Sequence, residues 1–325
     1  MKKKATIIPV ASGKGGVGKS VFTANLAIAL AKLGYSIVAI DLDLGGSNLH
    51  TYLGMSNKYS GLGDFLKSGH VPFEELSVKT PYENLRFIPG DGRTPFMANI
   101  PFKQRLDLLD HIQRIPADYV LCDLGAGSTF NTLNFYGMSH YGIIVTTFEP
   151  PAIMNFFMFI KNFIFRVISS MVRHDKVIFN QLVNQFRHTM STDPLTVTDL
   201  IKIIEDRDPD LAKKAFKACS YFKPRIIFNM GDYPDELKLA NKIDITIRQN
   251  LSIEVEYFGY IFYDDNVRKC ARKKTPLMVT YPDSIASLSI SDIARRITKI
   301  WSRTIDKSAL RLLEDTKKKY SVWKK

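Results

Sequence analysis

The sequence predicts an α/β protein whose mostly parallel, doubly wound sheet carries helices on both faces and a helical insertion. Three observations support this fold class. Apolar segments rich in β-branched residues alternate with helical segments along the chain. A glycine-rich segment separates the first strand from the first helix, and two later strands run into acidic residues. Polar residues at strand ends are typical of the ligand-binding edge of such a sheet.

The first predicted strand covers residues 6–11, which are apolar and include β-branched side chains. The first helix covers residues 20–32 and ends at Gly34, since glycine commonly follows the last helical residue. Backbone N–H groups at the start of that helix point outward, and the helix dipole favours an anion there. The turn between strand and helix is therefore suited to binding an anion.

This turn, Gly13-Lys14-Gly15-Gly16-Val17-Gly18-Lys19-Ser20, satisfies the phosphate-loop pattern. Its glycines let phosphates approach the backbone, Lys19 should reach the β- and γ-phosphates, and the Ser20 hydroxyl should ligate Mg²⁺. Lys14 is an extra lysine that can reach a phosphate across a subunit boundary. The turn therefore predicts ATP with Mg²⁺ as ligand and ATP-dependent dimerisation. The alternative is a chance match on a glycine-rich turn, against which the flanking strand and helix argue.

Two further strands supply carboxylates. Residues 35–43 run into Asp41 and Asp43, and residues 118–127 carry Asp123 before a glycine-rich turn. The carboxyl ends of parallel strands lie beside the phosphate loop in this fold. We expect Asp123 to serve the Mg²⁺ shell and Asp43 to orient the attacking water, with Asn48 nearby. Each acid alone has the alternative of a strand-end cap or turn former.

These segments resemble the motifs of the ParA/MinD group of ATPases. Residues 14–20 look like the deviant Walker A motif of the group, residues 41–48 like switch I, and residues 123–127 like Walker B and switch II. Three other segments resemble the MinD/FlhG branch more than the plasmid-partition branch: 147–153, 263–269 and 281–287. The resemblance covers about residues 5–168 and 224–300.

The resemblance implies roles for individual residues. Lys14 would contact the partner subunit's nucleotide, and Glu149 would contribute across the dimer. Asn229 matches the asparagine that reads adenine in this group, with the alternative of a strand-terminal turn residue. Tyr263 and Asp264 would line the base pocket. The expected nucleotide-binding residues are Gly13, Gly15, Gly16, Val17, Gly18, Lys19, Ser20, Val21, Asn48, Asn229, Tyr263 and Asp264, and the expected Mg²⁺ residues are Ser20, Asp43 and Asp123.

A helical insertion is predicted over about residues 171–222, where the group typically has a short connection. Further strands are predicted on either side of it, over 141–148, 224–228 and 255–262. The insertion contains helical segments near 175–190, 196–206 and 209–222. A preceding helix that includes residues 156–165 is apolar nearly all round, which suggests burial on two sides. Either the extra helices cover this helix, or they dock a partner protein.

The C-terminal residues 305–325 form a predicted basic tail after an ATPase domain over 1–304. Residues 295–325 hold 11 Lys or Arg against three acidic residues, interleaved with Trp301, Tyr320 and Trp323. A basic helix with Trp and Leu on one side suits an anionic membrane surface, and MinD and its relatives end in such a helix. The alternatives are a docked helix with a solvated lysine tail, or phosphate contacts with nucleic acid, which a net charge of +13 favours.

Cysteine and hydropathy patterns exclude some classes. The three cysteines are far apart, and neither they nor the six histidines have metal-ligand spacing, which argues against metal-carrying relatives. No run approaches the roughly 18 uncharged apolar residues of a spanning helix, and no signal segment precedes the phosphate loop. We therefore expect a cytoplasmic protein that cycles to the inner face of the membrane if the tail binds lipid.

The resulting functional hypothesis is an ATP-hydrolysing dimerisation switch of the ParA/MinD type. It would turn over slowly without a protein activator and would position a cargo such as a division, flagellar or other polar or membrane assembly. Two alternatives stay open. One is a DNA-segregation ATPase on nonspecific DNA, and the other is a nucleotide-gated scaffold that binds a partner with little hydrolysis.

Overall fold

The computed structural model describes residues 4–68, 71–90, 100–188, 196–251 and 253–323. The strands are β1 Thr6–Ser12, β2 Ile37–Leu42, β3 Val78–Lys79, β4 Leu85–Ile88, β5 Tyr119–Ala126, β6 Ile143–Thr146, β7 Arg225–Gly231 and β8 Glu256–Phe262. The helices are α1 Lys19–Lys32, α2 Leu49–Tyr52, α3 Leu62–Ser68, α4 Phe102–Gln113, α5 Phe130–Tyr136, α6 Pro150–Met171, α7 Lys176–His188, α8 Val197–Glu205, α9 Pro209–Tyr221, α10 Lys238–Leu251, α11 Asp265–Lys273, α12 Leu277–Thr280, α13 Ile285–Ile300 and α14 Ser308–Trp323. Short 3₁₀ helices are η1 Phe73–Leu76 and η2 Pro234–Leu237.

Within the described residues the strands form one eight-stranded sheet in the order β3-β4-β2-β5-β1-β6-β7-β8. All of its pairings are parallel except that of β3 with β4. The predicted fold class is therefore confirmed. Strands β3 and β4 were not predicted, because two and four residues are too short to show a strand pattern.

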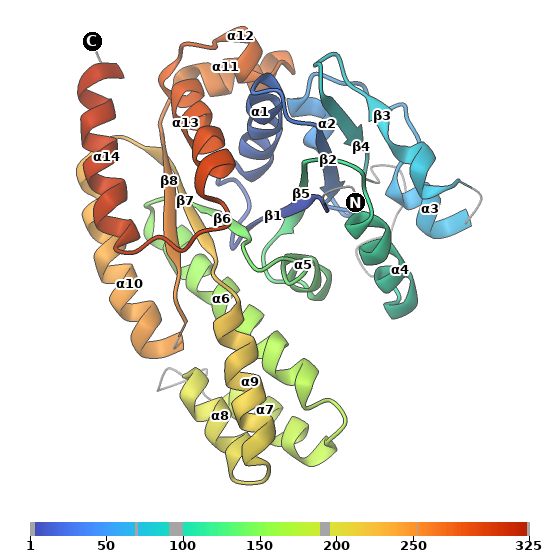
Figure 1. Ribbon diagram of the computed structural model, residues 1–325, viewed down its shortest axis with the longest axis vertical. Helices are drawn as coiled ribbons and strands as arrows, with labels where there is room; N and C mark the ends of the chain where they lie inside the picture. Colours follow the sequence, from blue (N-terminus) through green and yellow to red (C-terminus); the bar gives the residue numbers. More distant parts are fainter. Residues whose placement is uncertain (1–3, 69–70, 91–99, 189–195, 252, 324–325) are drawn as a thin grey trace.

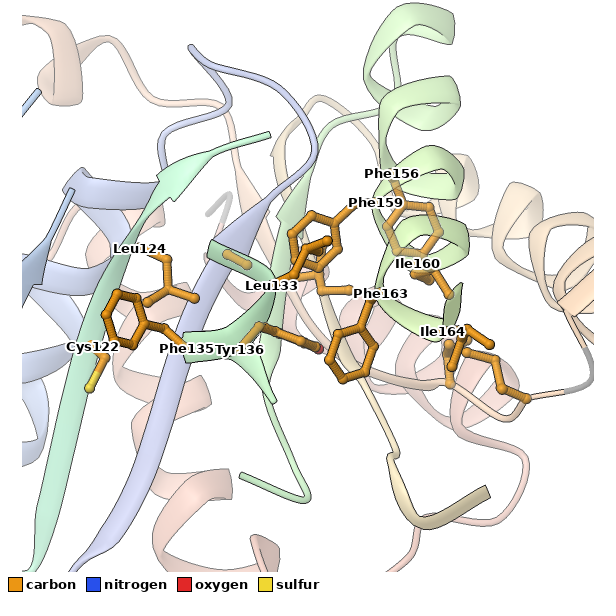
Figure 2. Packing of buried hydrophobic residues seen from close by; sticks show 14 of the residues in the cluster. Cys122, Leu124, Leu133, Phe135, Tyr136, Phe156, Phe159, Ile160, Phe163 and Ile164 are labelled. Atoms are coloured by element: carbon orange, nitrogen blue, oxygen red, sulfur yellow. The ribbon is translucent and has the colours of Figure 1, made fainter. Parts of the chain in front are cut away.

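Alternate residues of the central strand β1 point to opposite faces of the sheet, as strand geometry requires. Ile8 and Val10 pack into a core shared with α1 and α13, whereas Ile7 and Ala11 pack into a second core shared with α4, α5 and α6. Figure 2 shows the second core, in which α5 lies between β5 and α6. The ring of Tyr136 meets two phenylalanine rings of α6 edge-on there, at centroid distances of 5.2 and 5.0 Å.

The predicted insertion helices are present as α7, α8 and α9, although residues 189–195 lie outside the described residues. These helices lie together at the lower end of the molecule in Figure 1, away from α11 and α12 at the upper end. Helix α9 packs along α6, with Ala212, Ala215 and Cys219 buried. The sheet and α5 cover another side of α6, so its second half is buried on two sides. This packing supports the interpretation that the insertion covers α6.

Helix α6 corrects the expectation that the chain contains no span-like segment. Its 22 residues are long enough and apolar enough to cross a membrane, by length and composition only. The prediction missed it because Lys161 and Arg166 interrupt the uncharged run. Six of its apolar side chains are almost fully buried in the second core: Phe156, Phe159, Ile160, Phe163, Ile164 and Ile168. A core helix of this kind passes the same test of length and composition.

The C-terminal segment packs onto the domain as helix α14. The Tyr320 ring stacks on Phe262 of the edge strand β8, at a centroid distance of 5.1 Å, and Trp323 approaches the same ring edge-on. Lys317 forms an ion pair of 2.7 Å with Asp235 of η2. Helix α14 therefore covers the exposed edge of the sheet (Figure 1). The docked alternative matches this arrangement, while residues 324–325 lie outside the described part.

A buried ion pair at the amino-terminal edge of the sheet binds the segment that connects α13 to α14. Arg225 begins β7 and donates from Nε to Glu256 Oε2, at 2.9 Å, and Glu256 begins β8. The two terminal nitrogens of Arg225 donate to the carbonyls of Trp301 and Arg303, and the Ile305 N–H donates to Glu256 Oε1. This network fixes the connection between α13 and α14.

Candidate nucleotide-binding site

Three positions of the phosphate loop require glycine, two because of backbone conformation and one because of close packing. Gly16 and Gly18 have φ values of 86° and 84°, in the left-handed region that favours glycine. Gly13 is needed for packing, since a Cβ there would lie 2.2 Å from the backbone oxygen of Asn155 in α6. The loop therefore rests on the first turns of α6 and keeps its backbone open where α1 begins.

Lys19 and Asp123 form a buried ion pair at the carboxyl-terminal edge of the sheet. Lys19 Nζ lies 2.8 Å from Asp123 Oδ1, and the exposed fractions of the two side chains are 7% and 1%. The Thr23 hydroxyl donates toward the same carboxylate oxygen, at 3.1 Å, and the Ser20 hydroxyl lies 3.3 Å from Lys19 Nζ. The structure thus brings together the lysine predicted for phosphate and two residues predicted for Mg²⁺.

Asp41 belongs to the same site but was not among the predicted site residues. It is fully buried and lies beside Asp123 in the parallel register of β2 and β5. Its carboxylate accepts hydrogen bonds from the Ser47 hydroxyl at 2.6 Å, the Leu49 N–H at 3.0 Å and the Asp43 N–H at 3.1 Å. The carboxylate therefore fixes the loop that presents Asp43. The signal in the sequence was the spacing of Asp41 two residues before Asp43.

Burial raises the pKa of Asp41 to about 7, and the neighbouring charge of Asp123 adds to the increase. The hydrogen bonds from Ser47 and Leu49, and the charge of Lys19, act in the opposite direction. Two carboxylates and one ammonium group therefore share a dry site, where proton and cation binding are coupled.

Asp43 lies beside the turn that follows Asp123, as expected from its strand-end position. A Cβ at Gly125 would come within 3.4 Å of Asp43 Oδ1, and a Cβ at Gly15 would lie 4.0 Å from Ala126. The phosphate loop, Asp43 and the end of β5 therefore meet at one edge. Asn48 is exposed and donates to the carbonyl of Gly46 at 2.6 Å, so its side chain serves its own loop.

A cavity of about 250 Å³ lies next to the phosphate loop and brings together five predicted residues. These residues are Gly18, Val21, Asn229, Tyr263 and Asp264. The buried amide of Asn229 donates to the Val17 carbonyl at 2.8 Å, which ties the end of β7 to the loop. Asp264 accepts from Asn266 N–H at 2.9 Å and begins α11.

The rest of the cavity wall is mostly apolar and was not predicted. Phe22, Ile261, Leu277 and Ile290 contribute from four separate elements. Their spacing along the chain carries no signal, because only the fold places them around one space. A mostly apolar cavity beside a phosphate loop is suited to the base of a nucleotide.

Lys14 and Glu149 lie at the outer surface of the site. The Lys14 side chain is exposed, and in the described parts of the chain it forms no ion pair or hydrogen bond. Glu149 is exposed at the start of α6, and its side chain makes no capping hydrogen bond. The two lysines of the loop therefore differ, since Lys19 is paired with Asp123 of the same subunit and the Lys14 side chain is exposed to solvent.

The residues of this edge fit ATP with Mg²⁺. The left-handed glycines open backbone N–H groups to an anion, and Lys19 supplies a positive charge at the start of α1. The Ser20 hydroxyl with the Asp43 and Asp123 carboxylates offers the oxygen ligands that Mg²⁺ prefers. The fold and site together define a phosphate-loop nucleotide-binding protein.

The chain belongs to the family described as the CobQ/CobB/MinD/ParA nucleotide binding domain, which matches residues 8–277. The predicted relationship to ParA/MinD proteins is therefore confirmed. The antiactivator FleN of Pseudomonas aeruginosa is 25% identical over 294 residues, which cover 90% of this chain and 85% of FleN. The flagellum site-determining protein YlxH of Helicobacter pylori is 34% identical over 162 residues, 49% of this chain and 54% of YlxH.

A solved structure shows the same fold. The septum site-determining protein MinD of Pyrococcus horikoshii, complexed with Mg-ADP, superposes with a TM-score of 0.62 at 20% identity. The match covers 91% of this chain and 96% of that one. Its bound Mg-ADP supports nucleotide and Mg²⁺ as ligands of the family.

Proposed function

We propose that the protein is an ATP-hydrolysing switch whose subunits dimerise face to face around ATP. The observation that carries this proposal is the difference between the two lysines of the phosphate loop. Lys19 pairs with Asp123 inside the subunit, whereas Lys14 is exposed and, within the described residues, forms no ion pair or hydrogen bond. A free lysine on this loop is placed to reach a phosphate held by a second subunit.

The residues of the site divide the chemistry among them. Lys19 would exchange Asp123 for the β- and γ-phosphates, and Asp123 and the Ser20 hydroxyl would hold the Mg²⁺ shell. Mg²⁺ held there would supply positive charge to the phosphate oxygens. Asp43 orients the attacking water. Turnover is slow without an activator, because the loop that carries Asp43 must bring this carboxylate to the water before hydrolysis.

The switch would act on the position of a cellular machine, from a cytoplasmic pool. FleN is named an antiactivator, YlxH a flagellum site-determining protein and MinD a septum site-determining protein. We extend to this chain only what these roles share, which is control of where or when an assembly operates. A protein activator or cargo is part of this proposal.

The C-terminal helix α14 is less suited to membrane binding than its composition suggests. Three of its apolar residues, Leu312, Tyr320 and Trp323, pack on the domain, and Lys317 is paired with Asp235. Lipid binding through α14 would require the helix to leave β8. Nonspecific DNA is the alternative surface, supported by the net charge of +13.

ATPase activity of the full chain separates these surfaces. The rate is measured alone, with vesicles of anionic phospholipid, and with nonspecific duplex DNA at fixed salt. Stimulation by vesicles supports the membrane-cycling form of the switch, and stimulation by DNA supports a segregation ATPase. Stimulation by neither supports a nucleotide-gated scaffold that responds to a protein partner.

The dimerisation mechanism is tested with Lys14→Ala. We expect this variant to bind ATP with nearly normal affinity and to remain monomeric with Mg-ATP in light scattering. Lys58→Ala, which removes another exposed lysine, should dimerise like the unaltered protein. A Lys14→Ala protein that dimerises normally with ATP would contradict the switch mechanism and leave the phosphate loop intact.

A further inference from the structure

Helices α7, α8 and α9 form the helical projection. A groove of about 640 Å³ lies where α4 and α5 face α6 and the first helix of this projection. Phe102 of α4 and Phe130 at the start of α5 form one side. Arg166 and Arg173 from the α6 end, with Phe179 of α7, form the other. The groove shares none of its lining residues with the nucleotide cavity.

Arg166 and Arg173 line this groove, and Arg105 packs against its two phenylalanine rings. The buried Arg105 guanidinium lies over the ring of Phe102 at 5.4 Å and over that of Phe130 at 4.7 Å. The Arg166 guanidinium lies 4.5 Å from the same Phe130 ring. Burial lowers the pKa of Arg166, and the positive charges of Arg105 and Arg173 lower it further. Arg105 and Arg173 are therefore close enough for their charges to act on the Arg166 guanidinium.

This positive charge has no counter-charge in the described parts of the chain. No Asp or Glu lines the groove there, and none of the three arginines forms an ion pair. Arg105 donates to the Ile100 carbonyl and the Asn131 side chain, and Arg166 donates to the Asn134 side chain. Arg166 Nε is buried and has no hydrogen-bond partner. A buried donor in this state is costly unless a ligand completes it.

The groove also exposes apolar surface beside these charges. Phe102 and Phe130 are 55% and 53% exposed, which is high for phenylalanine. Carboxylates would satisfy the guanidinium groups, since the planar fork of arginine binds carboxylate oxygens in pairs. Apolar side chains would cover the rings. One ligand that offers both groups in alternation is a polypeptide segment rich in Asp or Glu and apolar residues.

We propose that this groove binds an acidic segment of a partner protein. Its carboxylates pair with Arg166 and Arg173, and its apolar side chains pack on Phe102 and Phe130. A flat bilayer or a DNA duplex would meet the exposed Arg173, whereas the half-buried Arg166 is reached more readily by single side chains that enter the groove. The groove reaches Ser128, directly after the turn at Gly127 that ends β5, so a bound segment lies beside the strand that carries Asp123.

The test uses the full chain and a fluorescent synthetic peptide in which Glu alternates with Phe and Leu, titrated without nucleotide. We expect saturable binding, and about tenfold or greater loss of affinity in both Arg166→Gln and Arg173→Gln, since each removes a charge-assisted hydrogen bond. Lys214→Gln, which removes an exposed charge from α9 of the same projection, should bind like the unaltered protein. Thermal unfolding of each variant checks that the fold is intact.

Three results would overturn the proposal. One is equal affinity for a peptide with Gln in place of Glu, which would leave only apolar contact. Another is no binding of the acidic peptide by the folded protein. The third is a failure of specificity, which two measurements detect. Lys214→Gln would lose as much affinity as the arginine variants, or anionic vesicles or duplex DNA would displace the peptide with an affinity that only Arg173→Gln reduces. The measurement needs no ATP, so its failure is separate from failure of the dimerisation switch.

Discussion

Two buried ion pairs lie at opposite edges of the same sheet and differ in how completely they are satisfied. Arg225 with Glu256, at the amino-terminal edge, has carbonyl or N–H partners for its remaining polar atoms and lies among the rings of Tyr141, Phe258 and Trp301. Lys19 with Asp123, at the carboxyl-terminal edge, is joined at 2.8 Å, and the other side-chain partners of this pair among the described residues are the hydroxyls of Ser20 and Thr23.

The difference separates a structural charge from a functional one. Arg225 is fully buried, and every interaction that it makes would be lost if it moved. Under the proposed function Lys19 exchanges Asp123 for a phosphate at the start of α1, where Gly16 and Gly18 adopt left-handed backbone conformations. A second carboxylate, that of Asp41, lies beside Asp123, so two carboxylates share the one ammonium group of Lys19. A saturated pair holds the fold, and an unsaturated one is ready to bind a ligand.

The largest expected effect is on stability, from Arg225→Met. This change leaves Glu256 buried without its partner, and we expect the free energy of unfolding to fall by about 3–5 kcal/mol. Chemical denaturation followed by circular dichroism measures it. Arg248→Met, which breaks an exposed ion pair of 2.8 Å with Asp244, should cost under about 1 kcal/mol. Equal costs for the two variants would remove the distinction between the pairs.

Lys19→Met should act on ligand affinity instead. We expect ATP affinity to fall about 10- to 100-fold, since a charged hydrogen bond to phosphate contributes roughly 1.5–3 kcal/mol. Calorimetric titration with Mg-ATP measures the change, and Lys58→Met serves as the exposed control. The folded Arg225→Met protein should bind ATP like the unaltered chain. Normal ATP affinity in Lys19→Met would show that this pair is structural too.

The second carboxylate at this edge makes the stability of the protein depend on pH. This second carboxylate is that of Asp41. Because the pKa of Asp41 is raised from 3.8 to about 7 on folding, the folded state holds a proton that the unfolded state releases. The stability that this proton confers is fully present below pH 3.8 and is lost as the pH rises through about 7. We expect Asp41→Asn to reduce the fall in unfolding free energy between about pH 5 and 8.

Denaturation of the nucleotide-free protein at the two pH values measures this difference. Asp107→Asn removes an exposed carboxyl and should leave the pH profile unchanged. A profile in Asp41→Asn that matches the unaltered protein would mean that Asp41 titrates normally.

The smallest expected effect comes from Asn229→Ala at the base cavity. Loss of its amide removes one neutral hydrogen bond, so ATP affinity should fall several-fold, by about 1 kcal/mol. Competition between ATP and GTP measures whether the preference for adenine falls with it. An unchanged preference would place the choice of base with other cavity residues, while the grip on phosphate would stay with Lys19.

Local patterns explain which parts of this molecule were predictable. Residues 13–20 needed only their order to predict the loop, and two of the insertion helices were predicted with the aid of helix-start residues at Asp199 and Asp208 to Asp210. The docked state of α14 was not predictable, because its basic and apolar residues suit a membrane and a sheet edge equally. The composition of α14 does not show whether the helix packs on the sheet edge or binds a membrane.

The same reason applies to the charged residues. Asp41 has the same sequence neighbours whether it caps a strand or holds a switch loop, and only the register of β2 and β5 puts it beside Asp123. Arg225 and Glu256 are far apart along the chain, as is Arg105 from Arg166. Contacts of this kind depend on strand order and helix packing.

The sequence by itself determined the fold class, the family and the phosphate-binding loop, because these follow from residues adjacent in the chain. Only the tertiary structure decided which charges are saturated and which are open. Whether a buried charge acts in structure or in binding depends on the polar partners that the fold places around it. Those partners come from distant segments, as Trp301, Arg303 and Ile305 do around Arg225 and Glu256.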